Sequence, residues 1–215
     1  MSKTLAIFVN HPQCSTHSAN GIMQALGTDY EYRIFTKHVV ENNFFDDVDM
    51  VCVPGGLGDA SSYYQLMWHN APLIRRYVRS GGRYLGICMG AYWAGRHYLG
   101  IVKDLTITQY IRRAGADTRR PHAKSQLVYW LDTEQHMFFY DGCAIVGKGI
   151  ANVIASYPNG DAAAVIQRGV GLIGPHPEST ASWYERYSYL RSLYHGGTHH
   201  ELLKNFVDQM FLQGQ

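Results

Sequence analysis

In the first half of the chain, short apolar runs alternate with amphipathic segments. The apolar runs are typical of buried strands, and the segments between them have the spacing of helices that cover a sheet. We predict strands at residues 4–9, 30–35, 50–53 and 83–87, and helices at residues 18–26, 72–80 and 91–98. Because alternating strands and helices form parallel sheets with right-handed crossovers, the pattern predicts an α/β fold. The carboxyl ends of its strands then share one edge, where ligands bind.

The second half of the chain is richer in strand patterns. We predict strands at residues 126–131, 137–140, 144–146, 153–157, 163–167 and 171–173, followed by helices at residues 182–194 and 199–211. Asn159-Gly160 is a hairpin signal, because these residues tolerate the positive φ of a two-residue turn. Since the sequence contains no internal repeat or linker, we predict a single domain over residues 1–215.

Cys88 stands at the predicted junction between a strand and a helix. Gly86 and Gly90 lie two residues to either side of it. A nucleophile at such a turn occupies a strained backbone conformation, so its neighbours must be small. The amino end of the following helix would favour the reactive thiolate. We therefore predict that Cys88 is a nucleophile, the alternative being a free cysteine of the core.

A cysteine nucleophile needs a base, and the base needs an orienting group. His176 follows a Gly-rich apolar run and lies between Pro175 and Pro177, which restrict the backbone. Glu178, two residues further on, can reach the far nitrogen of the ring. We predict a Cys88–His176–Glu178 triad; the alternatives are a surface-loop histidine and a solvated carboxylate.

A third apolar run ends in the turn Pro54-Gly55-Gly56. Acyl chemistry at a cysteine requires two hydrogen-bond donors for the developing oxyanion, and such a turn can present backbone amides. We assign these donors to the amide of Met89 and to an amide at Gly56 or Leu57. The alternative is an ordinary strand-terminating turn.

Together the three motifs resemble the class I glutamine amidotransferase-like family, which carries a Pro-Gly-Gly turn, a Gly-x-Cys-x-Gly elbow and a late His-Pro-Glu in this order. The chain is more closely similar to the amino-terminal amidotransferase-like domain of biotin–protein ligases, in a stand-alone form. Further segments that carry the resemblance are Cys14-Ser15-Thr16-His17-Ser18, Gly81-Gly82-Arg83-Tyr84-Leu85, Tyr140-Asp141-Gly142 and Asn159-Gly160-Asp161-Ala162-Ala163. The resemblance implies a flavodoxin-like fold: a mostly parallel central sheet with helices on both faces and a β-rich second half.

The resemblance also implies an activity. It indicates a cysteine-dependent amide hydrolase or amidotransferase that acts on a small-molecule amide, with glutamine the first candidate, through a thioester on Cys88 and without a cofactor. It further implies a separate acceptor or synthetase protein as a partner. The alternative is a binding or regulatory module that keeps the fold without turnover.

At two points the sequence differs from relatives within the family. Met89 stands where intracellular-protease-like relatives have a histidine, which argues against that branch of the family. The 37 residues that follow Glu178 (215 minus 178) hold no biotin-ligating domain, so we expect no ligase activity from this chain.

Composition excludes several other classes. The 215 residues are 46% hydrophobic and 17% charged, as expected for a largely buried sheet. No apolar run approaches the roughly 20 residues that span a bilayer, and the amino terminus does not resemble a signal peptide. The chain has four cysteines without metal-ligand spacing: Cys14, Cys52, Cys88 and Cys143. We therefore predict no metal site and no membrane contact, and we expect a reducing cytoplasmic environment.

Residues 103–124 carry six basic and two acidic side chains, a local charge of +4 (six minus two). This segment could bind a carboxylate or phosphate of the substrate, but a solvated loop is the interpretation we favour. Tyr110 is its only aromatic residue, which argues against nucleic acid as a partner.

Three further residues are expected to line the substrate pocket: Gly55, His17 and Tyr92. Each lies close to a predicted strand end or to the elbow. For the early turn, capping of the next helix by Ser18 is the simpler explanation, and for Tyr92 it is packing between helix and sheet.

Overall fold

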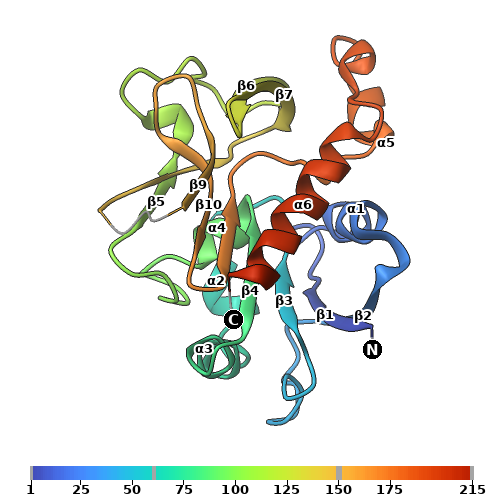
Figure 1. The fold of residues 1–215 in the computed structure, drawn as a ribbon, viewed down its shortest axis with the longest axis vertical. Coiled ribbons are helices and arrows are strands. Elements are labelled where there is room, and N and C mark those ends of the chain that lie inside the picture. The colour runs from blue at the N-terminus through green and yellow to red at the C-terminus, as the bar shows by residue number, and fades with distance from the viewer. Residues whose placement is uncertain (1, 60–61, 149–151, 214–215) are drawn as a thin grey trace.

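The computed structural model describes residues 2–59, 62–148 and 152–213. The described strands form one sheet in the order β2-β1-β3-β4-β11-β10-β9-β6-β7, with β8 beside β10 and β5 beside β8 (Figure 1). The strands are β1 (Lys3–Phe8), β2 (Tyr30–Phe35), β3 (Met50–Val53), β4 (Arg83–Ile87), β5 (Thr106–Gln109), β6 (Lys124–Trp130), β7 (Thr133–Phe139), β8 (Cys143–Val146), β9 (Asn152–Ser156), β10 (Ala162–Gln167) and β11 (Val170–Ile173). The α-helices are α1 (Thr16–Leu26), α2 (Ser62–Leu66), α3 (Ala71–Arg79), α4 (Met89–Trp93), α5 (Ala181–Glu185) and α6 (Thr198–Leu212). Short 3-10 helices are η1 (Gly27–Asp29), η2 (Tyr110–Arg112) and η3 (Arg191–Leu193).

The parallel part of the sheet runs from β2 to β11 and has the strand order of flavodoxin-like folds. Successive residues of β1 face opposite sides, as a strand requires. Leu5 and Ile7 belong to the core cluster that contains residues of α1 and α6. Ala6 and Phe8 belong to the cluster that contains residues of α3 and α4. Helices therefore cover both faces, and the predicted fold class is confirmed.

The register of the parallel strands brings three segments to one edge. Val53 at the end of β3 pairs with Gly86, and Ile87 at the end of β4 pairs with Ile173 at the end of β11. The chain that follows each of these strands therefore leaves the sheet at the same level. This edge receives the Pro-Gly-Gly turn, the Cys88 elbow and the His-Pro-Glu segment.

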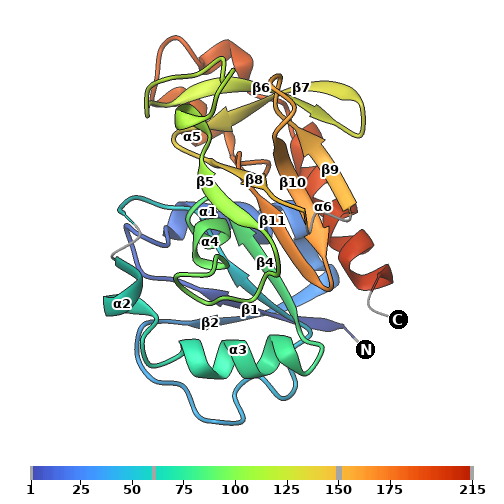
Figure 2. The same cartoon turned by 90° about the vertical axis from the view of Figure 1, so that its left-hand side faces the viewer.

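The antiparallel part extends the sheet through β10, β9, β6 and β7. In Figure 2 the β6–β7 hairpin and α5 lie together, at the end of the molecule away from α3. Every strand predicted for the second half is present, and the Asn159-Gly160 turn joins β9 to β10, with Gly160 at a φ of 85°.

Three expectations about the elements were wrong. The helix predicted at residues 91–98 is the five-residue α4, because the chain turns back at Gly95, whose carbonyl accepts from the Tyr98 amide. The helix predicted at residues 182–194 is split into α5 and η3, with successive turns closed by i→i+3 backbone hydrogen bonds between them. β5 lies inside the basic segment that we expected to be a loop, and it pairs with β8.

We expect Phe206→Ala to lower the free energy of unfolding by about 3–5 kcal/mol, because truncating a buried aromatic side chain leaves a cavity. Phe206 lies on α6 and is 0% exposed. Leu212→Ala is the matched control on the same helix; its side chain is 72% exposed, so its effect should stay within about 0.5 kcal/mol. Denaturant unfolding measures both changes, and equal losses would contradict the described position of α6.

Candidate active site

Cys88 lies at a sharp strand-to-helix turn with a φ of 49° and a ψ of −101°. Its backbone amide donates to the Ile173 carbonyl at 2.8 Å, which fixes the turn to the end of β11. A Cβ at Gly90 would collide with the Val53 carbonyl oxygen, and one at Gly86 would come 2.6 Å from the Gly90 carbonyl carbon. The two glycines are therefore required by close backbone packing, as their spacing predicted.

His176 and Glu178 lie beside Cys88, so the structure brings all three predicted residues together. The Nδ1 atom of His176 is 2.8 Å from Oε1 of Glu178, and the Cys88 side chain lies close enough to the ring to raise its pKa. A backbone hydrogen bond holds the segment that carries the ring, because the His176 amide donates to the Phe138 carbonyl at 2.9 Å. A Cβ at Gly55 would collide with the imidazole and lie 3.2 Å from the Cys88 Cβ. Only glycine at this position lets the ring approach the sulfur.

The His176 ring is held in its charged form. Burial opposes protonation of the imidazole, but the charges of Glu178 and Cys88 outweigh it and raise the pKa of His176 to about 10.

Ser18 takes part in the site, although the sequence analysis assigned it to helix capping. The N-cap of α1 is Ser15, whose side chain accepts from the His17 amide at 3.1 Å. The Ser18 hydroxyl donates to Glu178 Oε1 at 2.6 Å and accepts from the Gly55 amide at 3.0 Å. The only sequence signal was the four-residue spacing to Ile22, which places Ser18 on the buried face of α1.

The amides proposed for the oxyanion differ in their hydrogen bonding. The Leu57 amide donates to the Pro12 carbonyl at 2.8 Å, so it is not a free donor and this choice was wrong. Within the described residues no hydrogen bond involves the Gly56 amide. Met89 begins α4, and the first amide of a helix has no acceptor within that helix. Gly56 and Met89 therefore stay as predicted donors.

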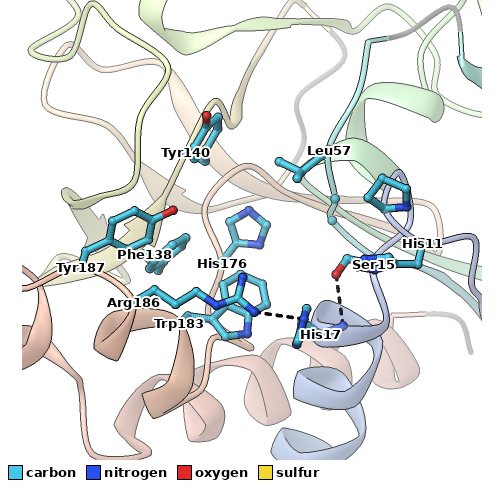
Figure 3. A pocket seen from close by; sticks show the side chains of 13 residues that line it. His11, Ser15, His17, Leu57, Phe138, Tyr140, His176, Trp183, Arg186 and Tyr187 are labelled. Carbon is cyan, nitrogen blue, oxygen red and sulfur yellow. Dashed lines mark hydrogen bonds between the residues drawn. The ribbon is translucent and has the colours of Figure 1, made fainter.

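Two neighbouring cavities open at the site. The first, of about 400 Å³, is lined by His176 together with Gly55 and His17, and Figure 3 shows its side chains. We call it the His176-side cavity. The second, of about 570 Å³, is lined by Cys88, Met89 and Tyr92, and we call it the Cys88-side cavity. Both cavities include Gly56, Leu57 and Tyr140 in their walls.

The basic segment lies partly against the Cys88-side cavity rather than wholly in solvent. Arg112 and Gln109 contribute to its wall, and Gln109 donates to Asp141 Oδ2 at 2.7 Å. Arg113 is paired instead with Asp161, with 2.7 Å between Nε and Oδ2. The segment thus fixes the β9–β10 turn and lines the site, which the favoured solvated-loop interpretation did not include.

The described ranges (2–59, 62–148 and 152–213) contain no group of three or more histidine, cysteine or acidic side chains that could hold a metal ion. No helix in them has the length and apolar character needed to cross a membrane.

Comparisons with solved structures define the fold. The chain is similar to a glutamine amidotransferase from Thermotoga maritima, with a TM-score of 0.70, 12% identity and 98% of each chain covered. It is also similar to PurLQS from Thermotoga maritima (TM-score 0.64, 18% identity, 99% of each chain). A further glutamine amidotransferase gives a TM-score of 0.62 at 16% identity and covers 96% of this chain and 98% of its own. The chain therefore has the glutamine amidotransferase-like fold.

One stretch of the sequence matches a narrower family model. Residues 10–104 match the family model of biotin-protein ligase, N terminal. A comparison with curated protein sequences finds no match. The family match and the fold together confirm the resemblance that the three motifs indicated.

We expect Glu178→Gln to lower the pKa of His176, because the neighbouring negative charge is lost while burial of the ring remains. The pKa of about 10 in the folded protein lies above the roughly 6.5 of an unfolded histidine. The charged ring therefore stabilises the fold fully below about pH 6.5, and this contribution disappears as the pH rises through about 10.

NMR titration of the His176 ring nitrogens measures this change. Glu185→Gln is the control, since it removes an exposed carboxylate from α5. A His176 ring that is neutral at pH 7 in the wild-type protein would contradict the ion pair.

Proposed function

We propose that the protein is a cysteine-dependent amide hydrolase or amidotransferase-like enzyme. The observation that carries the proposal is the arrangement at the elbow: a cysteine at positive φ beside a buried imidazole, both bordering Gly55, with the imidazole 2.8 Å from a buried carboxylate. Nucleophile, base and orienting group in this order are what thioester chemistry requires.

In the proposed reaction the Cys88 thiolate attacks the carbonyl carbon of the amide. The amides of Gly56 and Met89 stabilise the oxyanion, and the His176 imidazolium gives its proton to the leaving nitrogen as the carbon–nitrogen bond breaks. The neutral ring then accepts a proton from the incoming water or amine, which attacks the thioester and releases the sulfur. Glu178 keeps Nδ1 protonated throughout, because its Oε1 accepts from that nitrogen.

Glutamine is the amide that we propose to test first. Support for it comes from the fold and from the named relatives, two of which are described as glutamine amidotransferases. On the same ground we propose a separate acceptor or synthetase protein as a partner. A reducing, cytoplasmic environment is proposed because the described cysteines (Cys14, Cys52, Cys88 and Cys143) are all free thiols.

A binding or regulatory module is the second candidate function. One observation favours it: the Leu57 amide already donates to Pro12, so the oxyanion site depends on Gly56 and Met89 alone. Such a module would keep the fold and the buried ion pair without turnover. The two candidates differ in the reactivity of Cys88.

We expect iodoacetamide and an electrophilic glutamine analogue each to modify Cys88 at neutral pH in a single rapid step. Mass spectrometry of the intact protein measures the adduct over time. Cys88→Ala should abolish the adduct, and His176→Ala should slow it by at least about tenfold, because the cation that stabilises the thiolate is lost. Cys14 is the internal control, since its burial raises the pKa of its thiol well above the ordinary value.

Each result distinguishes the candidates. Modification by iodoacetamide but not by the analogue would retain the enzyme and exclude glutamine as its substrate. A Cys88 that reacts no faster than Cys14 would exclude the enzyme and leave the binding module.

A further inference from the structure

The His176-side cavity has basic and aromatic walls but no acidic one. None of its described lining residues is an aspartate or glutamate, whereas Asp59 and Asp141 line the Cys88-side cavity together with one cation, Arg112. Its basic side chains, besides His176, are His11, His17 and Arg186. The two cavities that meet at the reacting pair therefore differ in charge. Such a difference selects the part of the substrate that each one accepts.

Arg186 supplies the cation of this cavity. It follows α5, and its Nη2 atom donates to Nε2 of His17 on α1 at 3.1 Å, so the bond spans the two helices, as Figure 3 shows. His17 accepts through Nε2 and so carries its proton on Nδ1. Within the described residues no carboxylate is paired with Arg186. A guanidinium has five N–H donors, so this one keeps donors that can bind an anion.

Aromatic side chains form the rest of the wall. The Trp183 ring lies 5.2 Å from the His176 ring and 5.2 Å from the Phe138 ring, between centroids. Tyr140 and Tyr187 also line the cavity. A volume of about 400 Å³ is more than ten times the roughly 30 Å³ that one water occupies in the liquid, so the cavity can hold an organic molecule.

The proposed reaction determines which reactant must approach the His176 ring, and therefore which one occupies the cavity beside it. His176 gives a proton to the leaving nitrogen and takes one from the incoming nucleophile, so both must approach the ring. By microscopic reversibility, a leaving amine and an acceptor amine occupy the same place. The acyl part then extends from Cys88 into the other cavity.

We infer that the His176-side cavity binds the amine component of the reaction, and that this amine carries an anionic group on an apolar or aromatic body. Arg186 binds the anion, and Trp183 with its aromatic neighbours packs against the body. This inference rests on the proposed function, because the amine is defined by its attack on a thioester at Cys88. It adds a second, organic substrate to a reaction that water alone would otherwise complete by hydrolysing the thioester.

The transfer step balances without a further reagent. The amine nitrogen attacks the thioester carbonyl, a carbon–nitrogen bond forms and the carbon–sulfur bond breaks. The proton lost by the amine passes to the neutral His176 ring, which leaves the thiolate and imidazolium pair of the resting site.

The test uses p-nitrophenyl acetate to acetylate Cys88, and then measures how the acetyl group divides between two amines. L-Phenylalanine carries a carboxylate, and phenethylamine has the same aromatic body without it. Mass spectrometry measures the amounts of N-acetylphenylalanine and N-acetylphenethylamine. The amount of each product formed with Cys88→Ala is subtracted before the ratio of the two is taken. Comparing this ratio between variants cancels the intrinsic nucleophilicity of the two amines.

Arg186→Gln removes the charge but keeps an N–H donor for His17. We expect it to lower the ratio by at least about tenfold, a difference of about 1.4 kcal/mol. Arg191→Gln is the matched control, because Arg191 lies in the same segment, donates to the Glu185 carbonyl and does not line the cavity. It should leave the ratio unchanged.

The outcomes separate this inference from the proposed function. Acetylation of Cys88 with the same ratio in Arg186→Gln as in the wild type would overturn the inference alone. An equal fall in Arg191→Gln would also overturn it, since the effect would then be one of general charge. Absence of the p-nitrophenol burst in the wild type would overturn the proposed function, and the inference with it.

Discussion

A charged carboxylate buried beneath the sheet edge is the constraint on which the site depends. Glu178 is 0% exposed, and a buried charge is costly unless it is paired and hydrogen-bonded. Both of its donors, Ser18 and His176, converge on Oε1, while Oε2 has no hydrogen-bond partner among the described residues. Glycine at position 21 is required as well, because a Cβ there would collide with the Glu178 carbonyl oxygen. The position of α1 is thus tied to the same carboxylate that orients the imidazole.

This constraint connects segments that are far apart in the sequence. Ser18 links the carboxylate to the Gly55 amide, so α1, the turn after β3 and the loop after β11 form one hydrogen-bonded unit. Gly55 also leaves room for the imidazole to reach Cys88. Because the parallel register brings these segments level, the geometry of the site follows from the sheet and is secured by the buried ion pair. The ionisation of His176 is therefore a property of the fold as well as of the proposed chemistry.

Local signals in the sequence were enough to predict the elbow and every described strand except β5. Long-range contacts account for most of what the sequence did not reveal. Gly86 and Gly90 flank Cys88 at the spacing of a sharp strand-to-helix turn, and the apolar runs mark the buried strands. Ser18 could not be linked to Glu178, since 160 positions separate them and capping explains the same residue type. Residues 186–190 follow α5 as successive turns, although they lie within a segment that has a helical pattern. The contact between Arg186 and His17 likewise exists only after folding.

The fold by itself does not determine which substrate the site accepts. Similar structures at 12% and 18% identity share the path of the backbone with this chain. The position of the elbow is set by that backbone, through its amides and the parallel register of the strands. The cavity walls consist of side chains from loops and helix ends, such as Arg186, Trp183 and Tyr140, which the sheet does not dictate. Two proteins can therefore keep the thiolate, imidazole and carboxylate in the same geometry and still accept different amides and amines. For this chain the lining of the two cavities, rather than the fold, is the basis on which we infer the amide and the amine.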